Sequence, residues 1–446
     1  MGSFAPPKDC VVPPEQPSVE TSYSWVRLVV SITLSTLGCV GLWSLAIALP
    51  AVQADFGVQR AGASLPYTLT MIGFMIGGIM VGRSTDRFGI LPPLAGCTIL
   101  MGFGYILTAS APTLHVFAVV SGLTIGLGSA ASFAPLVADA SLWFDQHRGL
   151  AISLVTIGSS LSGVVWPPII QHFITEVGWR QAHIGIGIFC MATMLPLALV
   201  LRRRPVFHKP TVEAASTGSA KQAVGLPPNV THALLTLAGL CCCVAMSMPQ
   251  LHLIAYCADL SYGPARGAQM LAVMLGFGVL SRLIFSWVLN RIGGLPTLLL
   301  GSTMQAIAIA LYLPFDGLVS LYVISATFGM AQGGLVPSYA VIIRELFPAR
   351  EAGLRVSLAI STTLAGMALG GWLAGAIYDR TGSYAAALIN GIAWNIVNLA
   401  IVFWLLQQMR GRAERVHPPA DPALQVHVDG HQPPGHAHEL MLHRRS

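Results

Sequence analysis

Long apolar stretches separated by short polar segments make up most of the chain. Each stretch is close to the roughly 20 residues that a helix needs to cross the hydrocarbon core of a bilayer. The pattern predicts an all-α membrane protein with twelve transmembrane helices. These helices are expected near residues 27–51, 64–82, 92–110, 114–140, 149–174, 182–201, 232–256, 267–289, 295–314, 318–343, 353–377 and 384–408.

The composition agrees with a membrane protein. The chain is 54% hydrophobic and only 9% charged, with a mean hydropathy of +0.69, whereas about 25% of the residues of a soluble domain are charged. We therefore expect an integral multi-pass protein of the inner (plasma) membrane, with lipid around its helices.

Basic residues are spread unevenly over the two sets of connecting segments. With the N-terminus inside, the outside loops hold only Arg60, Arg180, Arg266 and Arg380 of the 24 Lys and Arg residues, and Arg282 lies within a span. Because cytoplasmic segments are enriched in Lys and Arg, both termini are predicted to be cytoplasmic. The net charge of +6 thus reflects topology, and no basic patch interleaved with aromatic residues indicates nucleic-acid binding.

The longest polar stretch between spans, residues 202–230, divides the helices six and six. We expect residues 26–201 to form an N-terminal six-helix bundle and residues 231–408 a C-terminal one, joined by a cytoplasmic linker. Residues 1–25 are Pro-rich and polar, and residues 409–446 are polar and His-rich. Both compositions are typical of disordered tails.

An internal repeat supports this division into halves. A shift of 204 residues aligns DRFGILPPL (86–94) with NRIGGLPTL (290–298), and it also aligns Gly149 with Gly353. Because each half holds an even number of spans, both copies enter the membrane in the same sense. Such parallel, pseudo-symmetric repeats are typical of secondary transporters.

No pattern indicates an enzyme or a cofactor site. The glycine-rich tracts 73–82 and 122–128 lack the Gly-Lys-Ser/Thr ending of a phosphate-binding loop, and no nucleophile motif or pair of polar-cavity carboxylates is evident. The eight cysteines show neither CxxC nor His/Cys ligand spacing. We expect no catalysis, no cofactor, no metal site and no disulfide, so that ion gradients must supply the energy.

The segment GRSTDRFG (82–89) resembles the Gly-x-x-x-Asp-Arg-x-Gly loop signature of the major facilitator superfamily. A closer resemblance is to its monocarboxylate transporters and oxalate/formate antiporters. That resemblance implies the major facilitator fold and alternating access of two halves to a small monocarboxylate, carried together with a proton. It rests on the eighth-helix arginine and on residues 49–68, 143–154, 178–180 and 374–384.

The chain also departs from these patterns. Ile90 and Leu91 follow the loop signature where the superfamily usually has basic residues, and Gly278 stands where animal monocarboxylate carriers have an acidic residue. The first helix has no lysine, and the eleventh lacks the second cation of the oxalate carriers. A two-cation clamp for a dicarboxylate is therefore not predicted.

Arg282 lies inside the eighth predicted helix. An arginine at the centre of a membrane helix costs about 2.5–3.5 kcal/mol on insertion scales. Arg282 could reach the cytoplasmic surface, about 10 Å away along the helix, or it could bind the substrate. Gly278, one turn away, leaves room for a ligand, and a guanidinium matches a carboxylate in shape. We favour the substrate role.

Four further polar residues at membrane depth are candidates for the same site. His252 in the seventh helix can exchange a proton near neutral pH, although a hydrogen-bonded packing role suits it nearly as well. Ser132 lies in the fourth helix, and Gln332 and Tyr339 lie in the tenth. The resemblance implies that helices one, four, seven and ten surround the cavity, whereas most other polar residues in spans bridge helices.

The loop signature also suggests a gate on the cytoplasmic side. A carboxylate at Asp86 would be favoured by the positive end of helix eleven and would latch that side, while Asp139 would pair with Arg87 or Arg148. The alternative is a charged turn that only fixes topology. The gating candidates are Gly82, Asp86, Arg87, Gly89, Asp139 and Arg148.

Two other functions stay open at this stage. One is exchange of organic anions, and the other is a transporter-like receptor that binds a carboxylate and signals through its tails. Short low-complexity tails argue against the receptor. An intramembrane enzyme would need a nucleophile and a base at one depth, and the spans offer no convincing pair. The sequence does not indicate an oligomeric state.

Overall fold

The computed structural model describes residues 20–144, 146–203 and 224–416, and helices are the only regular secondary structure among them. Twelve helical segments in this part of the chain are long and apolar enough to cross a membrane, which confirms the number predicted from the apolar stretches. The predicted tails and linker fall largely outside the described residues. Where they are described, helices extend into them, from Ser22 at one end and as far as Val416 at the other.

Six spans form the N-terminal half. The first consists of two helices and the fourth of five short ones, while each of the others is one continuous helix. The elements are α1 (Ser22–Gly38), α2 (Val40–Phe56), α3 (Arg60–Phe88), α4 (Leu91–Ala109), α5 (Leu114–Val120), η1 (Ser121–Gly126), α6 (Leu127–Ser129), η2 (Ala130–Ser132), α7 (Ala134–Ala140), α8 (Arg148–Val177) and α9 (Trp179–Val200).

Six more spans form the C-terminal half, and only the tenth of the chain is divided into two helices. The elements are α11 (Pro228–Asp259), α12 (Pro264–Ile292), α13 (Gly294–Leu311), α14 (Leu318–Gln332), α15 (Leu335–Leu346), α16 (Ala349–Thr381) and α17 (Tyr384–Val416).

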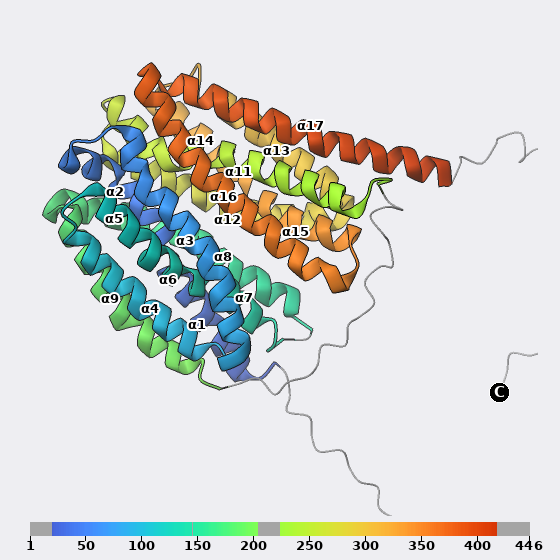
Figure 1. Cartoon of the computed structure of the whole chain (residues 1–446), viewed down its shortest axis with the longest axis horizontal. Helices are drawn as coiled ribbons and strands as arrows, with labels where there is room; N and C mark the ends of the chain where they lie inside the picture. Colours follow the sequence, from blue (N-terminus) through green and yellow to red (C-terminus); the bar gives the residue numbers. More distant parts are fainter. Residues whose placement is uncertain (1–19, 145, 204–223, 417–446) are drawn as a thin grey trace, which may run out of the picture.

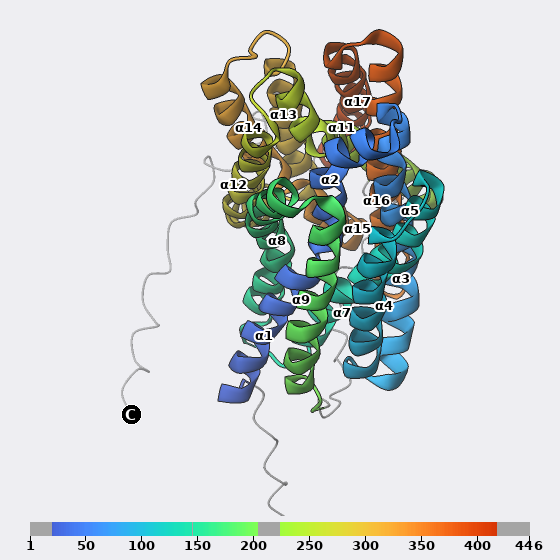
Figure 2. The same ribbon diagram turned by 90° about the vertical axis from the view of Figure 1, so that its left-hand side faces the viewer.

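The two halves form separate bundles that meet mainly along two pairs of helices. Figure 1 shows the N-terminal half in blue to green and the C-terminal half in yellow-green to red, and Figure 2 shows the same division from the side. Helix α3 packs against α16, and α8 packs against α12. We call the end of the molecule where α3 begins the Arg60 end, and the end where α3 finishes the Asp86 end.

Glycines at matching positions of the two halves make the same turns. Gly89 ends α3 with φ 82° and ψ 176°, and Gly293, which lies 204 residues later, ends α12 with φ 82° and ψ 175°. A positive φ of this size is rare for any residue with a Cβ atom. The backbone therefore repeats where the sequence repeat predicts it.

Three spans are interrupted near their middle. The first bends at Cys39, between α1 and α2. The fourth passes through a π-helical turn at 121–126 and a 3₁₀ turn, and it breaks at Phe133, whose φ of −124° and ψ of −90° are not helical. The tenth breaks at Gly333 and Gly334. Transporters often place their binding sites beside discontinuous helices of this kind.

Candidate functional site

Arg282 lies on α12 where this helix faces the N-terminal half. Its side chain is half-buried, and Nη1 donates a hydrogen bond to the main-chain oxygen of Thr156 on α8, at 3.2 Å. None of the described carboxylates forms an ion pair with it. The guanidinium thus lies at the boundary between the halves and holds a carbonyl instead of a counter-ion.

The arginines that are buried among the described residues behave differently. Arg27 and Arg60 are 1% and 8% exposed, and each has a carboxylate partner, Asp139 at 2.7 Å and Asp259 at 2.6 Å respectively. Removing a charge from water is costly unless an opposite charge and hydrogen bonds replace the water. Arg282 therefore has capacity for an anion that Arg27 and Arg60 lack.

Gln332 lies beside Arg282 and is paired with a second glutamine. Nε2 of the Gln250 side chain on α11 donates a hydrogen bond to the side-chain oxygen Oε1 of Gln332 at the end of α14. Gly278, one helical turn before Arg282, leaves the space: a Cβ atom there would lie 3.3 Å from Gln332 Nε2.

Two polar atoms of this glutamine pair have no partner. Gln332 Nε2 and Gln250 Oε1 are buried, and neither makes a hydrogen bond within the described residues. Buried polar atoms are almost always satisfied by protein or water, so a free donor and a free acceptor next to Gly278 offer hydrogen bonds to a ligand. The sequence prediction of Gln332 did not include Gln250, although Gln250 stands two residues before His252 at the same depth.

The break in the tenth span brings Gln332 close to the arginine. A Cβ atom on Gly333 would lie 2.6 Å from the backbone nitrogen of Arg282, and one on Gly334 would lie 2.2 Å from the ring of Phe285. Only glycine allows the chain to approach α12 this closely. The two glycines therefore allow the tenth span to lie against α12 next to Gln332.

Ser132 lies on the side of the N-terminal half, where the interrupted first and fourth spans meet. A Cβ atom on Gly38 would lie 1.8 Å from its Oγ, and the thiol of Cys39 points at its main-chain oxygen, at 3.9 Å. The hydroxyl of Ser132 is buried without a hydrogen-bond partner. The first span also contacts α8 near the partner of Arg282, since Thr36 Oγ1 donates to the main-chain oxygen of Gly158, two residues after Thr156.

His252 points away from this group. It is 2% exposed, its Nε2 lies 2.8 Å from the main-chain oxygen of Gly371 on α16, and its Nδ1 lies 3.4 Å from the hydroxyl of Tyr384 on α17. A cavity of about 20 Å³ adjoins it, lined also by Tyr256 and Tyr312. That volume suits about one water molecule. The structure thus places His252 inside the C-terminal half, toward the Arg60 end.

Tyr339 is also separated from Arg282. Its side chain is 1% exposed within the core of the C-terminal half, and its hydroxyl donates to the side-chain oxygen of Asn398 on α17, at 3.0 Å. Asn395 donates from the same helix to the main-chain oxygen of Ser302, at 2.8 Å. These polar residues bridge helices, as most polar residues in spans do.

The loop-signature residues lie at the exposed Asp86 end of α3. Arg87 lies 5.2 Å above the ring of Phe88, and no described residue forms an ion pair with Asp86. The backbone beside Gly82 and Gly353 is open, with no atom within 4 Å of a Cβ position. The described residues show no hydrogen bond or ion pair between Asp86 and α16, and the side chains of residues 349, 350 and 352 lie outside them. The gating role of this end stays a prediction.

Asp139 is paired with Arg27, which the prediction did not name. Both of its oxygens accept hydrogen bonds from Arg27, at 2.9 Å from Nε and 2.7 Å from Nη2, whereas the prediction named Arg87 or Arg148. The Arg148 side chain lies outside the described residues. The first helix was predicted to begin near residue 27, but α1 begins at Ser22, so Arg27 lies in its second turn, facing α7.

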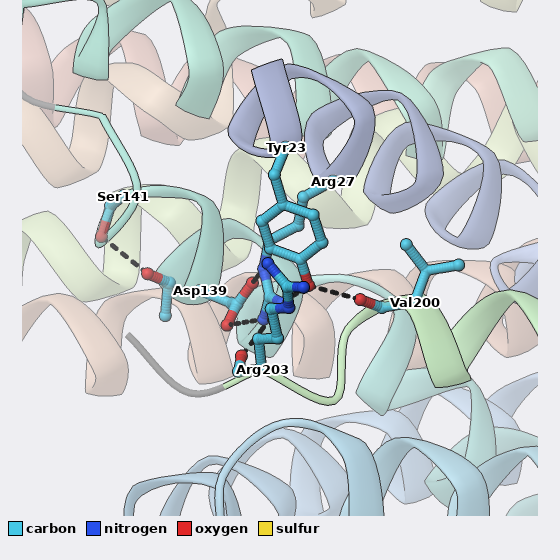
Figure 3. A network of polar contacts seen from close by, with 7 residues as sticks. Tyr23, Arg27, Asp139, Ser141, Val200 and Arg203 are labelled. Carbon is cyan, nitrogen blue, oxygen red and sulfur yellow. Dashed lines mark hydrogen bonds and ion pairs between the residues drawn. The ribbon is translucent and has the colours of Figure 1, made fainter. Parts of the chain in front are cut away.

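Figure 3 shows how the Arg27–Asp139 pair joins three spans. Arg27 Nη1 also donates to the hydroxyl of Tyr23 and to the main-chain oxygen of Arg203, at 3.2 Å each, and Tyr23 donates to the main-chain oxygen of Val200 at 2.6 Å. The network ties α1, α7 and the end of α9 together at the Asp86 end of the N-terminal half. All of these contacts lie within that half.

Comparison with protein families gives a match over most of the chain. Residues 32–326 and 296–433 match the family described as the Major Facilitator Superfamily. Among curated proteins, MFS-type transporter 1 of Ophiocordyceps sp. is 25% identical over 72% of this chain and 70% of its own length. Monocarboxylate transporter 13 of Rattus norvegicus is 25% identical over 77% of this chain and 78% of its own length.

Solved structures of transporters share the fold. A bacterial homolog of the human lysosomal transporter Spinster, in an inward-facing and unoccupied conformation, has a TM-score of 0.67 at 15% identity, covering 89% of this chain and 98% of its own. The nucleoside transporter NupG has a TM-score of 0.66 at 14% identity, covering 87% and 99%. At these identities the likeness is one of fold alone.

Proposed function

Because the chain belongs to the Major Facilitator Superfamily, we propose that it is a secondary active transporter that moves a small monocarboxylate with a proton by alternating access of its two halves. The observation that carries this proposal is the position of Arg282, a half-buried cation at the boundary between the halves without a carboxylate partner among the described residues.

The hydrogen-bonding capacity of Arg282 suits a carboxylate. A guanidinium carries five N–H donors, and Thr156 accepts from one nitrogen only. The remaining donors can form two parallel hydrogen bonds to a carboxylate, which is the strongest geometry available to such a pair. The substrate would then supply the missing counter-charge, and the free amide atoms of Gln250 and Gln332 would contact the rest of the molecule.

The comparisons and the charge distribution support the other parts of the proposal. Monocarboxylate transporter 13 is similar to this chain over 351 residues. The excess of Lys and Arg on the segments at the Asp86 end favours a cytoplasmic location of this end and of both termini. A carboxylate that moves with one proton is electroneutral, so a proton gradient could drive its uptake without opposition from the membrane potential.

Uptake into proteoliposomes tests this function. The purified full-length chain would be reconstituted and offered a panel of labelled acids, including lactate, pyruvate, formate and a larger aromatic acid. We expect an inward proton gradient to accelerate uptake of at least one monocarboxylate and a protonophore to abolish the acceleration. Uptake that responds neither to the proton gradient nor to the protonophore, but requires an anion inside the vesicles, would identify an exchanger. No uptake of any acid would reject carboxylate transport.

A further inference from the structure

Arg60, the first residue of α3, reaches from the N-terminal half into the C-terminal half. Its Nη2 donates to Asp259 Oδ1 on α11 at 2.6 Å, and its Nη1 donates to the hydroxyl of Tyr384 on α17. The guanidinium also lies 4.5 Å above the ring of Tyr378 on α16. One side chain of the first half is thus held by three helices of the second.

Asp379 on α16 adds a second connection at the same place. Its two oxygens accept from the backbone nitrogens of Arg60 and Ala61, at 2.8 and 2.7 Å. The first backbone N–H groups of a helix have no partner within the helix and favour a negative charge, so a carboxylate of one half caps a helix of the other. Gly375 permits the approach, because a Cβ atom there would lie 2.9 Å from the backbone of Arg60.

These contacts close the Arg60 end in the described conformation. The next hydrogen bond between α3 and α16 runs from Thr68 Oγ1 to the main-chain oxygen of Ala368, at 3.1 Å, two turns further along α3. Beyond it, no hydrogen bond or ion pair joins residues 69–87 of α3 to the described part of the C-terminal half, and Asp86 and Arg87 are exposed. The described hydrogen bonds between α3 and the C-terminal half thus gather toward the Arg60 end.

Tyr384 connects this closure to His252. The tyrosine hydroxyl accepts a hydrogen bond from Arg60, so its own proton is free to be donated to His252 Nδ1, 3.4 Å away. His252 Nε2 faces a carbonyl oxygen, which only accepts, and therefore carries the hydrogen. A neutral imidazole, with a proton on Nε2 and a lone pair on Nδ1, satisfies this hydrogen-bond pattern with the tyrosine as donor.

A protonated His252 would not suit the closed state. The new N–H at Nδ1 would face the Tyr384 hydroxyl, displacing the proton that this hydroxyl donates, and would bring a second cation close to Arg60. The other titratable side chains around His252 are Tyr256 on the same helix and Tyr312 at the end of α13, both uncharged near neutral pH. The nearest acids, Asp259 and Asp379, are both engaged by Arg60 or its backbone.

We propose that Arg60, Asp259, Asp379 and Tyr384 form the gate at the Arg60 end, and that His252 is the proton-carrying residue whose protonation releases this gate. The proposal deepens the proposed transport function, and its proton coupling rests on that function. His252 takes up a proton from the Arg60 side while the gate is open and releases it toward the Asp86 side as the gate closes, because closure brings Arg60 and the Tyr384 hydroxyl against it. Tyr384 is the positioning residue that transmits the change.

Distances between spin labels at the Arg60 end test the proposal. Labels on Ser110→Cys in the N-terminal half and Leu313→Cys in the C-terminal half would report opening, since both positions are exposed. The seven described native cysteines are buried, and Cys10, which lies outside the described residues, would be replaced by serine. The full chain would be measured in lipid nanodiscs without any substrate, between about pH 7.5 and about pH 5.5, the range in which histidine changes charge.

We expect the long-distance population of the otherwise native chain to rise at least about threefold as the pH falls. Arg60→Gln should show the long distance at both pH values. His252→Gln, whose amide can still donate to the Gly371 oxygen, should stay closed at both, and Tyr384→Phe should lose most of the pH response. Asp55→Asn is the matched control, because Asp55 pairs with Arg180 at the same end but within one half, and it should respond like the native chain.

Two results would overturn the proposal. A full pH response in His252→Gln would assign the titration to another group, such as the gate carboxylates, and an unchanged closed population in Arg60→Gln would show that these contacts do not hold the gate. Because no substrate is present, a failure to transport monocarboxylates would leave the distance result intact, and the two proposals can fail separately.

Discussion

The guanidinium of Arg282 on α12 and the main-chain oxygen of Thr156 on α8 lie 3.2 Å apart, across the boundary between the two halves. The contact has two consequences. It gives a charged side chain at membrane depth a partner that a carboxylate can replace without leaving a buried charge behind. It also means that the candidate binding residue holds the halves together, so that occupancy of the site and the arrangement of the halves are linked.

The glutamine pair should contribute to substrate affinity. Replacing Gln332 with alanine removes the free Nε2 donor and leaves Gln250 without its acceptor, so we expect KM to rise about tenfold, in line with the roughly 1–3 kcal/mol attached to an unsatisfied buried group. Turnover should change little. Uptake kinetics in proteoliposomes would measure both constants.

Tyr339→Phe is the control for the Gln332→Ala variant. Its hydroxyl is bonded to Asn398 in the core, so its loss should lower thermal stability slightly and leave KM unchanged. If Tyr339→Phe raised KM as much as Gln332→Ala does, the ligand would have to contact the tyrosine, and the position assigned to the site would be wrong.

The Arg27–Asp139 pair should dominate the stability of the N-terminal half. Asp139→Asn leaves a buried guanidinium without a counter-charge, which typically costs about 3–5 kcal/mol. Thermal unfolding in detergent should show a clear drop in Tm. Asp55→Asn breaks a pair whose side chains are 37% and 41% exposed and should cost about 0–1 kcal/mol. Equal losses in both variants would contradict the structural role given to Arg27.

The sequence alone predicts some of these features and not others. The twelve spans, the repeat and Arg282 follow from local patterns, because the length of an apolar stretch and a charge inside it can be seen without knowing which helices touch. The gate at the Arg60 end could not be predicted in this way. Arg60 and Asp259 are 199 residues apart, and each resembles an ordinary charge in an outside loop.

The same limit applies to the interior of the helices. Gln250 was overlooked because its function depends on a neighbour on α14, and Arg27 because the start of α1 was placed too late. The interruptions at Cys39 and at Gly333 leave the apolar pattern intact. They become visible only when the close approach of another helix is known, as for Gly38 against Ser132.

Asp86 should affect turnover more than affinity. The residue lies far from Arg282, at the exposed end of α3, and any contact with α16 would form only when the Asp86 end closes. We expect Asp86→Asn to slow turnover several-fold with little change in KM. Glu176→Gln is the control, because Glu176 is an exposed acid of the same half at the opposite end. Equal turnover in both variants would show that Asp86 has no gating role and belongs to a turn that only fixes topology.

Substrate valence gives another prediction. One guanidinium neutralises one carboxylate, and a second, unpaired carboxylate would carry a desolvation penalty of several kcal/mol, more than a factor of about ten in affinity. Lactate and pyruvate should therefore compete for uptake more strongly than oxalate or succinate at neutral pH. Tight dicarboxylate binding at neutral pH would show that another cation takes part.

Arg282→Lys tests the central claim most directly, with Arg291→Lys as the control on the last turn of the same helix. Lysine keeps the charge but lacks the planar pair of donors. At matched expression in proteoliposomes, we predict that Arg282→Lys lowers monocarboxylate uptake at least about tenfold while Arg291→Lys transports normally. Uptake by Arg282→Lys with the native rate and KM would contradict the assignment of Arg282 as the carboxylate-binding residue.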